Sequence, residues 1–502
     1  MKNKLIPYIG ALLLGVFSLS SCDNGFEDMN ENPNAVLKPD PKSMFTLAEV
    51  YMNGQDFSHT RTNNLYTSQF VQYFASPGSS GSIYVWSGSL SGAVFGETYG
   101  KGLNQTFQLQ SVIPQTDDYN NMNQACRIMK AYMFQRLTDA YGEIPYFEAG
   151  KGYNGLLFAP KYDTQKVIYD DLLKELDQAS DALDASKPFV GNADLFYKGD
   201  IAKWKKFANS LLLRVAMRIS NVDPALSKQY VEKAVAKGVF TSNADNVVLQ
   251  HELNPQGVKT NPITSTWAIK EINGGDCNIK YSKTFIDQLK NNNDPRLRIL
   301  AKLEGSGDNT PAKQQGLDNG ALEFPNGGNK KLISDPNTST VLRTDAPTII
   351  MHNAEVQFLL AEAAQKGWNV NGTTKAFYEN GVKSAMQMLT VFGNKVPSVT
   401  DAEYDTYIAA HPFDANKALE QIGTQKWISL LFNGYEAFAE YRRTGFPILT
   451  PVNHPGSETN GTIPRRLIYD QSELITNAAN YREAIKRQGP DLLTTKIWWD
   501  KK

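Results

Sequence analysis

The sequence has few of the residues that most often build disulfides and metal sites. Only three of its 502 residues are cysteine and only five are histidine. Three cysteines are too few for a disulfide framework in a chain of this size, so we expect no disulfide bond and interpret Cys126, inside an apolar helical segment, as a buried free thiol. The histidines are scattered without HExxH or paired ligand spacing, which argues against a histidine-based metal site.

An excess of charge of either sign is also missing. The formal net charge is −1, so the chain lacks the strongly basic surface that binds nucleic acid or an anionic membrane. We therefore expect no nucleic acid partner.

Sequence motifs of catalysis are absent as well. No GxSxG, Walker A or GxGxxG sequence survives inspection as a phosphate-binding or catalytic motif, and the glycine-rich stretch "GSSGSIYVWSGSLSG" is interpreted as a flexible loop because no helix is expected to start behind its glycines. Pairs of carboxylates, as glycosidases use, cannot be recognised from sequence spacing. We expect no enzymatic activity, with a surface hydrolase or protease as a remote alternative.

The N-terminus has the order of a bacterial lipoprotein signal. Lys2 and Lys4 precede a short apolar run, and "LSSC" then ends at Cys22, as in a lipobox whose cysteine is lipidated. Residues 1–21 are therefore predicted to be a lipoprotein signal peptide, and the polar residues 22–41 a lipidated tether. No later segment approaches the ~20 apolar residues of a membrane helix, so the lipid is the only expected anchor.

Helical periodicity dominates the rest of the chain. Apolar residues recur every three or four positions over residues 166–183 and 201–219, which predicts amphipathic helices. A further helix over 226–238 should begin with Asp223 as N-cap and Pro224 in its first turn and end at Gly238. Together with the helix before it, this segment predicts a helix hairpin.

The same paired unit returns at residues 354–392. Gly367 should end its first helix, Thr373 or Thr374 should cap the second, and alanine and glycine occupy positions of close approach. A paired unit of about 35 to 40 residues resembles a tetratricopeptide repeat. Residues 127–142 and 426–445 are further helical candidates, apolar on nearly all sides.

Three intervals lack this period. Residues 70–110, 240–350 and 446–500 are rich in Gly, Asn, Pro and Asp, and long irregular stretches of this kind are usually functional or disordered. Strands should be few and short, as in "NVVLQHE" and "PTIIMH". The predicted fold class is mainly α, with tetratricopeptide-like helix pairs, a loop-rich second part and minor short β-strands, forming one domain over residues 42–502.

Aromatic and amide side chains are the distinctive residues of these intervals. Flat rings cover the C–H faces of sugars while amides and carboxylates meet hydroxyl groups. The candidate ligand-binding residues are Tyr73, Tyr84, Trp86, Trp267, Asn273, Asp276 and Asn278. The alternative for Trp86 and Trp267 is that each ring only anchors its own loop.

The stretch "NNNDPRLR" at residues 291–298 offers oxygen ligands for calcium. It lacks the spacing of a known calcium loop and is more simply a turn after a helix that ends near Lys290. We expect no cofactor, with calcium as the alternative.

Several stretches together resemble a known family. These are "FEDMNENPNAV", "AYMFQRLTDAYGEIPYFEA", "IYDDLLKELDQA", "NNNDPRLR", "EVQFLLAEAA", "LLFNGYEAFAEYRRTGFP", "IPRRLIYDQSELITNAANYREAI" and "IWWD". They resemble, in order along the chain, the SusD/RagB outer-membrane lipoproteins, and in particular the SusD-like branch.

The resemblance implies a fold and a function. Members of this family combine tetratricopeptide-like helix pairs with a loop-rich second half. They cover a SusC-like TonB-dependent transporter on the outer face of the outer membrane and capture glycans, or in some members peptides, without catalysis. The expected function is thus a cell-surface nutrient-binding lipoprotein that delivers oligosaccharide to such a transporter; binding of peptides or protein fragments is the alternative.

The resemblance also bears on individual residues. Acidic residues just after the lipidated cysteine act as a surface-export signal in this family, and Asp23, Glu27 and Asp28 have that position. In "EYRRTG", basic side chains suit the negative end of a helix and the glycine suits its stop, so we interpret this motif as architecture. The family provides no fixed binding motif to carry onto the candidate ligand residues.

Overall fold

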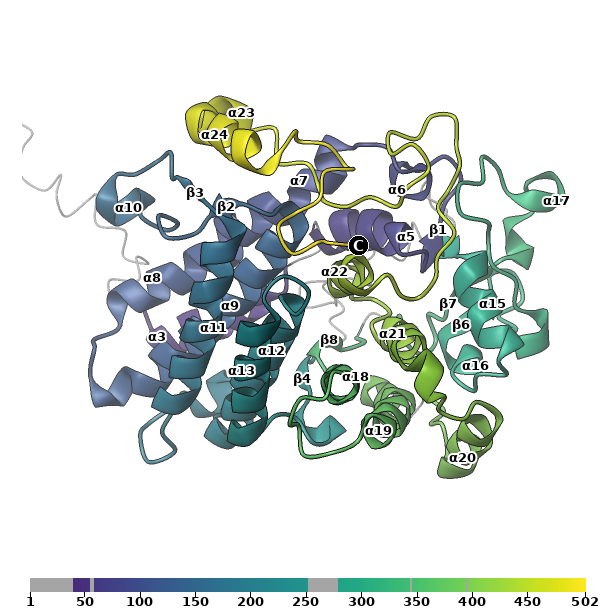
Figure 1. The fold of residues 1–502 in the computed structure, drawn as a ribbon, viewed down its shortest axis with the longest axis horizontal. Helices are drawn as coiled ribbons and strands as arrows, with labels where there is room; N and C mark the ends of the chain where they lie inside the picture. The colour runs from purple at the N-terminus through teal and green to yellow at the C-terminus, as the bar shows by residue number, and fades with distance from the viewer. Residues whose placement is uncertain (1–38, 55–57, 252–278, 344, 394–395) are drawn as a thin grey trace, which may run out of the picture.

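The computed structural model describes residues 39–54, 58–251, 279–343, 345–393 and 396–502, and most of its regular structure is helical (Figure 1). The predicted mainly α class is confirmed. Within these ranges no helix has both the length and the apolar character needed to cross a membrane. The predicted signal peptide, Cys22 and the candidate export residues Asp23, Glu27 and Asp28 lie outside the described residues.

Helices follow one another along the whole described chain. The longer ones are α3 (Pro41–Met52), α7 (Gly88–Glu97), α8 (Asn104–Val112), α9 (Asn120–Tyr141), α11 (Gln165–Ala182), α12 (Ile201–Arg218), α13 (Pro224–Lys237), α15 (Lys283–Asn291), α18 (Asn353–Gln365), α19 (Thr374–Gln387), α20 (Asp401–Ala410), α21 (Ala418–Ser429), α22 (Gly434–Thr444) and α24 (Ala478–Gln488). Short helices are α5 (Ser68–Phe70), α6 (Ser80–Ile83), α10 (Gly152–Gly155), α16 (Leu297–Leu300), α17 (Pro325–Gly328) and α23 (Glu473–Thr476), and two π-helical segments are η1 (His59–Thr67) and η2 (Thr98–Leu103).

The predicted caps of α13 are present. The Asp223 side chain accepts a hydrogen bond from Leu226 N, Pro224 is the first helical residue, and Gly238 follows the helix with φ of 94°. The side chain thus satisfies one of the backbone donors that every helix start leaves open, and glycine ends the helix in a conformation that other residues rarely adopt. The predicted hairpin of α12 and α13 is confirmed.

The second predicted pair is α18 and α19. Thr373 caps α19 by accepting from Ala376 N. A Cβ atom added at Gly381 would lie 2.6 Å from Cε1 of Phe358, so the glycine allows the two helices to approach closely. The first pair lies with α9 and α11 on one side of the molecule, and the second pair lies beside it with α21 (Figure 1).

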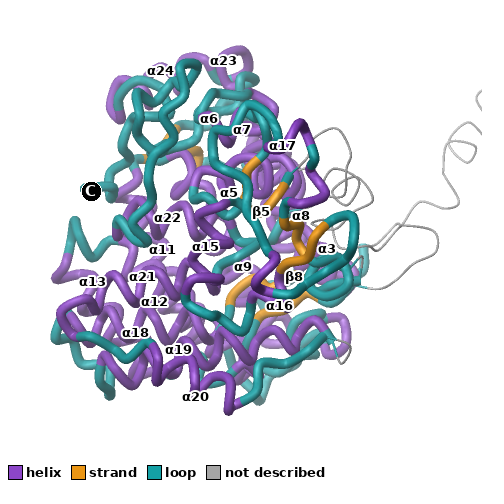
Figure 2. The backbone as a smooth tube through the Cα atoms, turned by 90° about the vertical axis from the view of Figure 1, so that its right-hand side faces the viewer, coloured by secondary structure: helices purple, strands orange, loops and turns teal. Residues whose placement is uncertain are grey.

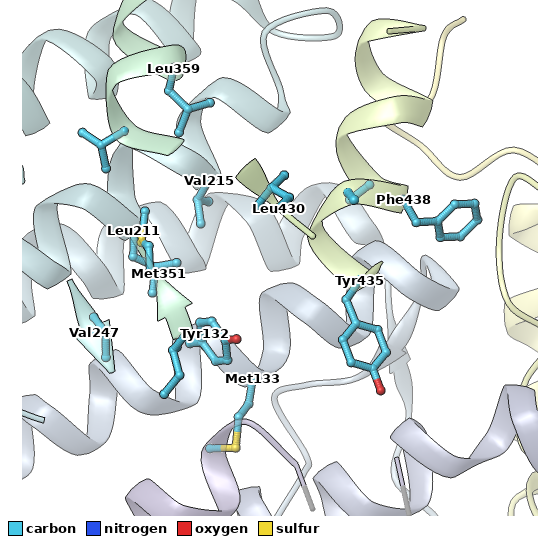
Figure 3. Close-up of a cluster of buried hydrophobic side chains, with 14 of the residues drawn as sticks. Tyr132, Met133, Leu211, Val215, Val247, Met351, Leu359, Leu430, Tyr435 and Phe438 are labelled. Carbon is cyan, nitrogen blue, oxygen red and sulfur yellow. The ribbon is translucent and has the colours of Figure 1, made fainter. Parts of the chain in front are cut away.

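One cluster of buried hydrophobic side chains connects these helices, from Phe45 near the start of the described chain to Trp499 near its end. Figure 3 shows its middle, where Tyr132 of α9, Leu211 and Val215 of α12 and Leu359 of α18 surround strand residues. Burial of apolar surface of this kind contributes roughly 25 cal/mol per Å² to folding. Cys126 is within this core as a free thiol, and burial raises its pKa to about 12.

Buried ion pairs join the same helices. Arg214 of α12 holds Glu355 of α18 through two hydrogen bonds of 2.6 and 2.7 Å. Arg443 of α22 holds Glu362 of α18 through bonds of 2.7 and 2.5 Å and also contacts Glu440. Arg442 and Arg443 are in the last turn of α22 and Gly445 follows with φ of 78°, so the predicted architectural role of this motif is confirmed.

Glu440 lies at the centre of these pairs. Burial alone would raise the pKa of this carboxyl, but the cations Arg443, Lys426 and Arg218 around it hold the pKa well below its usual range. Removal of one cation would therefore leave a buried charge with less compensation.

Within the described residues the strands are short and pair in four antiparallel ribbons. They are β1 (Phe74–Ala75) with β5 (Lys280–Tyr281), β2 (Ile144–Pro145) with β3 (Tyr162–Asp163), β4 (Val247–Leu249) with β8 (Thr348–Met351), and β6 (Ala301–Leu303) with β7 (Ser334–Pro336). The two stretches predicted as strands thus pair with each other as β4 and β8. Figure 2 shows helices filling most of the molecule and several strand segments gathered toward one side.

Two predictions were wrong in detail. Within the interval 70–110, expected to be irregular, the chain from Gly88 onward forms α7, η2 and α8 in direct succession, so a helix does begin in the glycine-rich stretch of residues 78–92. The range 426–445 is not one helix but parts of two, because Phe432 adopts φ of 73° between α21 and α22. Positive φ in a non-glycine residue breaks helical hydrogen bonding.

Candidate functional site

The first loop of candidate residues is anchored at both ends. Phe74 of β1 pairs with Tyr281 of β5, and a Ser79 hydroxyl then caps α6 and donates to Gln69 at 2.6 Å. A Cβ atom at Gly81 would lie 2.3 Å from the backbone oxygen of Leu65. The loop is therefore pressed against η1, and only glycine fits at this position.

Trp86 lies at the end of this loop, between α6 and α7. Its side chain is partly buried against the core, and its backbone N–H donates to an Oε2 atom of Glu458 at 2.9 Å. Glu458 N in turn donates to Tyr84 O at 3.1 Å. Two hydrogen bonds thus fix the backbone that carries the indole.

The surroundings of Trp86 are polar. A Cβ atom at Gly88 would lie 3.5 Å from Cζ2 of Trp86 and 3.6 Å from Cδ of Gln471, so the Gln471 amide borders the same place. Glu458 and Gln471 are both exposed, and the Trp86 indole N–H has no partner among the described residues. A partly exposed ring with a carboxylate and an amide beside it can cover a sugar face and bind its hydroxyl groups.

Tyr73 and Tyr84 have a different place. Both are fully buried: the Tyr73 ring stacks on Trp427 with centroids 5.0 Å apart, and the Tyr84 hydroxyl accepts from Gln72 Nε2 at 3.4 Å. Burial raises the pKa of Tyr84 to about 12. The expectation that these two rings face a ligand is corrected, because packing in the core removes them from the surface.

The remaining candidates, Trp267, Asn273, Asp276 and Asn278, lie outside the described residues. The described chain ends at His251, just after β4, and resumes at Ile279, one residue before β5. Because β5 pairs with β1, Ile279 is close to the start of the loop that carries Trp86.

Glu458 and Gln471 are the residues that sequence reasoning missed. Glu458 is 372 positions from Trp86 along the chain, and Gln471 lies in a stretch that carries the family resemblance but has no ligand-binding pattern. A contact over this distance has no periodicity that could predict it.

Other candidate ligand groups are already engaged. In the stretch 291–298, both carboxylate oxygens of Asp294 accept hydrogen bonds from Arg296, in a turn behind α15. His352 caps α18 by accepting from Glu355 N at 3.0 Å, and burial lowers its pKa to about 3. Over the described ranges, no three His, Cys, Asp or Glu residues are grouped so that they would hold a metal ion.

Comparison with known proteins assigns the family. Residues 33–470 match the model of a SusD-like family described as starch-binding and associating with the outer membrane. The chain belongs to the SusD-like family. The resemblance seen in the sequence is thereby confirmed.

Solved structures of SusD-like proteins share the whole fold. A chitin-binding protein is 35% identical with a TM-score of 0.83, and the alignment covers 92% of this chain and 100% of that one. A SusD-like protein from Bacteroidetes AC2a is 27% identical, with a TM-score of 0.81 and coverage of 92% and 100%. A chitin-binding SusD homologue from Flavobacterium johnsoniae is 26% identical, with a TM-score of 0.75 and coverage of 91% and 97%. No curated protein matches the chain.

Proposed function

We propose that this protein is a nutrient-binding lipoprotein that captures oligosaccharide and delivers it to a SusC-like TonB-dependent outer-membrane transporter. The observation that carries the proposal is the partly exposed Trp86, fixed by Glu458 and bordered by Gln471, in a family described as starch-binding. Two of the similar structures are of chitin-binding proteins, which favours a carbohydrate cargo. The proposed role is binding without catalysis.

In this proposal Trp86 stacks on a sugar ring while Glu458 and Gln471 bind hydroxyl groups. Trp267, Asn273, Asp276 and Asn278 are proposed as further ligand contacts. Their support is the chain connection, since the segment that contains them joins the described structure at Ile279, beside β1.

The direct test is calorimetry of the purified protein with starch-derived and chitin-derived oligosaccharides. We expect Trp86→Ala to weaken binding about tenfold or more, because buried aromatic contacts dominate binding energies. Trp368→Ala is the matched control, since Trp368 is also partly buried but lies in the turn after α18. Equal losses in both variants, or no saccharide binding, would reject the proposal.

A peptide pool in the same assay tests the alternative cargo. Binding of peptides with no response to saccharides would move the function to peptide capture. Release of saccharide fragments during incubation would instead indicate a hydrolase.

We also propose that Cys22 carries the lipid and that Asp23, Glu27 and Asp28 direct the protein to the cell surface, with residues 1–21 removed. A Cys22→Ala variant should lose incorporation of labelled fatty acid and leave the membrane fraction. Replacement of the three acidic residues by their amides should retain the lipid but protect the protein from protease added to whole cells. A lipidated Cys22→Ala variant would contradict the proposal.

Delivery requires the transporter. Deleting the gene of the SusC-like partner should abolish saccharide uptake while the purified binding protein keeps its affinity. Uptake that persists without the transporter would contradict the proposed partnership.

A further inference from the structure

An open pocket of about 600 Å³ lies at another place in the fold. It is bordered by the start of α11, the end of α24 and the C-terminal segment that contains Lys496, Trp498 and Lys501. Trp86, Glu458 and Gln471 do not line it. It is therefore separate from the saccharide site proposed above.

The lining carries an excess of positive charge. Four of its side chains are cations, Lys166, Arg487, Lys496 and Lys501, and two are carboxylates, Glu143 and Asp500.

Both carboxylates already have arginine partners. Arg487 bonds to Glu143 at 2.6 Å, and Arg465 donates to Asp500 from Nε at 2.7 Å. Lys496 and Lys501 form no ion pair with any residue in the described ranges. The two lysines thus offer positive charge that the protein does not neutralise.

The start of α11 adds to the positive electrostatic potential of the pocket. This helix has 18 residues, and its N-cap Thr164 makes no side-chain capping hydrogen bond, so backbone N–H groups at its positive end remain open to an anion.

Gln165, the next residue, lines the pocket and is only 2% exposed. Its Nε2 donates to Thr138 O at 2.7 Å, but its Oε1 has no partner among the described residues. A buried acceptor without a donor is costly, and a hydroxyl group of an occupant would supply one.

Trp498 provides an apolar wall. Its ring is partly buried beside Tyr169, with centroids 6.1 Å apart, and it also lines the pocket. A ring face, unpaired ammonium groups and an acceptor amide together match a molecule that has C–H faces, hydroxyl groups and negative charge.

We propose that this pocket binds an acidic saccharide whose carboxylate lies between Lys496, Lys501 and the start of α11 and whose sugar ring packs against Trp498. The site is independent of the Trp86 surface, so either one can fail without the other.

The test is calorimetry of the purified protein with trigalacturonic acid and with its methyl ester, which has the same rings but no charge. We expect the acid to bind with roughly millimolar affinity or better and the ester not to bind. The double variant Lys496→Gln and Lys501→Gln should bind the acid about tenfold more weakly, because two unpaired cations are lost.

A matched variant removes two lysines elsewhere. Lys375→Gln and Lys417→Gln change the net charge equally, at α19 and just before α21. This variant and Trp86→Ala should retain the affinity for trigalacturonic acid within about twofold. Absence of binding, equal binding of the ester, or an equal loss in the control variant would overturn the proposal.

Discussion

Trp86 and Glu458 are joined by a hydrogen bond of 2.9 Å from the backbone N–H of the first to the carboxylate of the second. Glu458 returns a bond from its own N–H to Tyr84 O. The indole at the proposed saccharide site is thus positioned by a residue from the opposite end of the chain.

This bond predicts the effect of substituting Glu458. Glu458→Ala removes the acceptor, so we expect saccharide affinity to fall about five- to tenfold, the equivalent of one hydrogen bond near 1 kcal/mol. Glu458→Gln keeps a side-chain oxygen and should retain most of the affinity. Calorimetry on both variants checks this, and an equal loss with Gln would show that affinity depends on the charge of Glu458 rather than on the hydrogen bond that holds Trp86.

The buried pair of Arg443 and Glu362 predicts a large effect on stability. Arg443→Met leaves the buried carboxylates Glu362 and Glu440 without this partner, and we expect a loss of about 3–5 kcal/mol in the free energy of unfolding. Urea denaturation followed by circular dichroism measures it.

The control for Arg443 is a pair at the surface. Arg298 bonds to Glu403 at 2.8 Å with side chains 29% and 35% exposed, so Arg298→Met should cost about 0–1 kcal/mol. Similar losses in the two variants would contradict the structural importance of the buried pair.

The helices were predictable because their signals are local. The caps of α13 and the glycine contact between α18 and α19 follow from neighbouring residues and a 3.6-residue period. The helical run over residues 88–112 escaped prediction because glycine and serine blur that period, and because η2 shifts the hydrogen-bond register between α7 and α8.

The site was predictable only in part, for a different reason. Tyr73 and Trp86 occur in similar loop-like sequence, yet Tyr73 stacks on Trp427, 354 positions away, while Trp86 stays partly exposed. Burial of an aromatic residue depends on such distant partners, which sequence periodicity does not report. Glu458 escaped for the same reason.

Asp335 predicts a pH dependence of stability. Its carboxylate is fully buried 2.6 Å from the Lys280 ammonium, and burial outweighs this cation and raises the pKa of Asp335 from 3.8 to about 7. The folded state therefore binds this proton more tightly than the unfolded chain does. The stability that this proton contributes is complete below about pH 4 and is lost as the pH rises through about 7.

We expect the free energy of unfolding of the wild type to fall, relative to Asp335→Asn, by about 1 kcal/mol per pH unit between about pH 5 and 7. Urea denaturation across this range measures the difference. Asp401→Asn, at a carboxylate that is 67% exposed, should leave the slope unchanged. A difference that rises with pH would contradict the raised pKa.

Gly81 and Gly96 provide a matched pair that tests how the Trp86 loop is held. A methyl group at Gly81 would meet the Leu65 carbonyl oxygen at 2.3 Å, whereas at Gly96, inside α7, it would find no atom within 4 Å. We expect Gly81→Ala to destabilise the protein by about 1–3 kcal/mol through overpacking and to weaken saccharide binding, because the backbone before Trp86 must move. Gly96→Ala should be neutral or stabilising by up to about 1 kcal/mol, since alanine favours a helix over glycine. Thermal denaturation and calorimetry on both variants make the comparison, and unchanged affinity in a destabilised Gly81→Ala protein would mean that the loop's contact with η1 supports the fold but not the orientation of the indole.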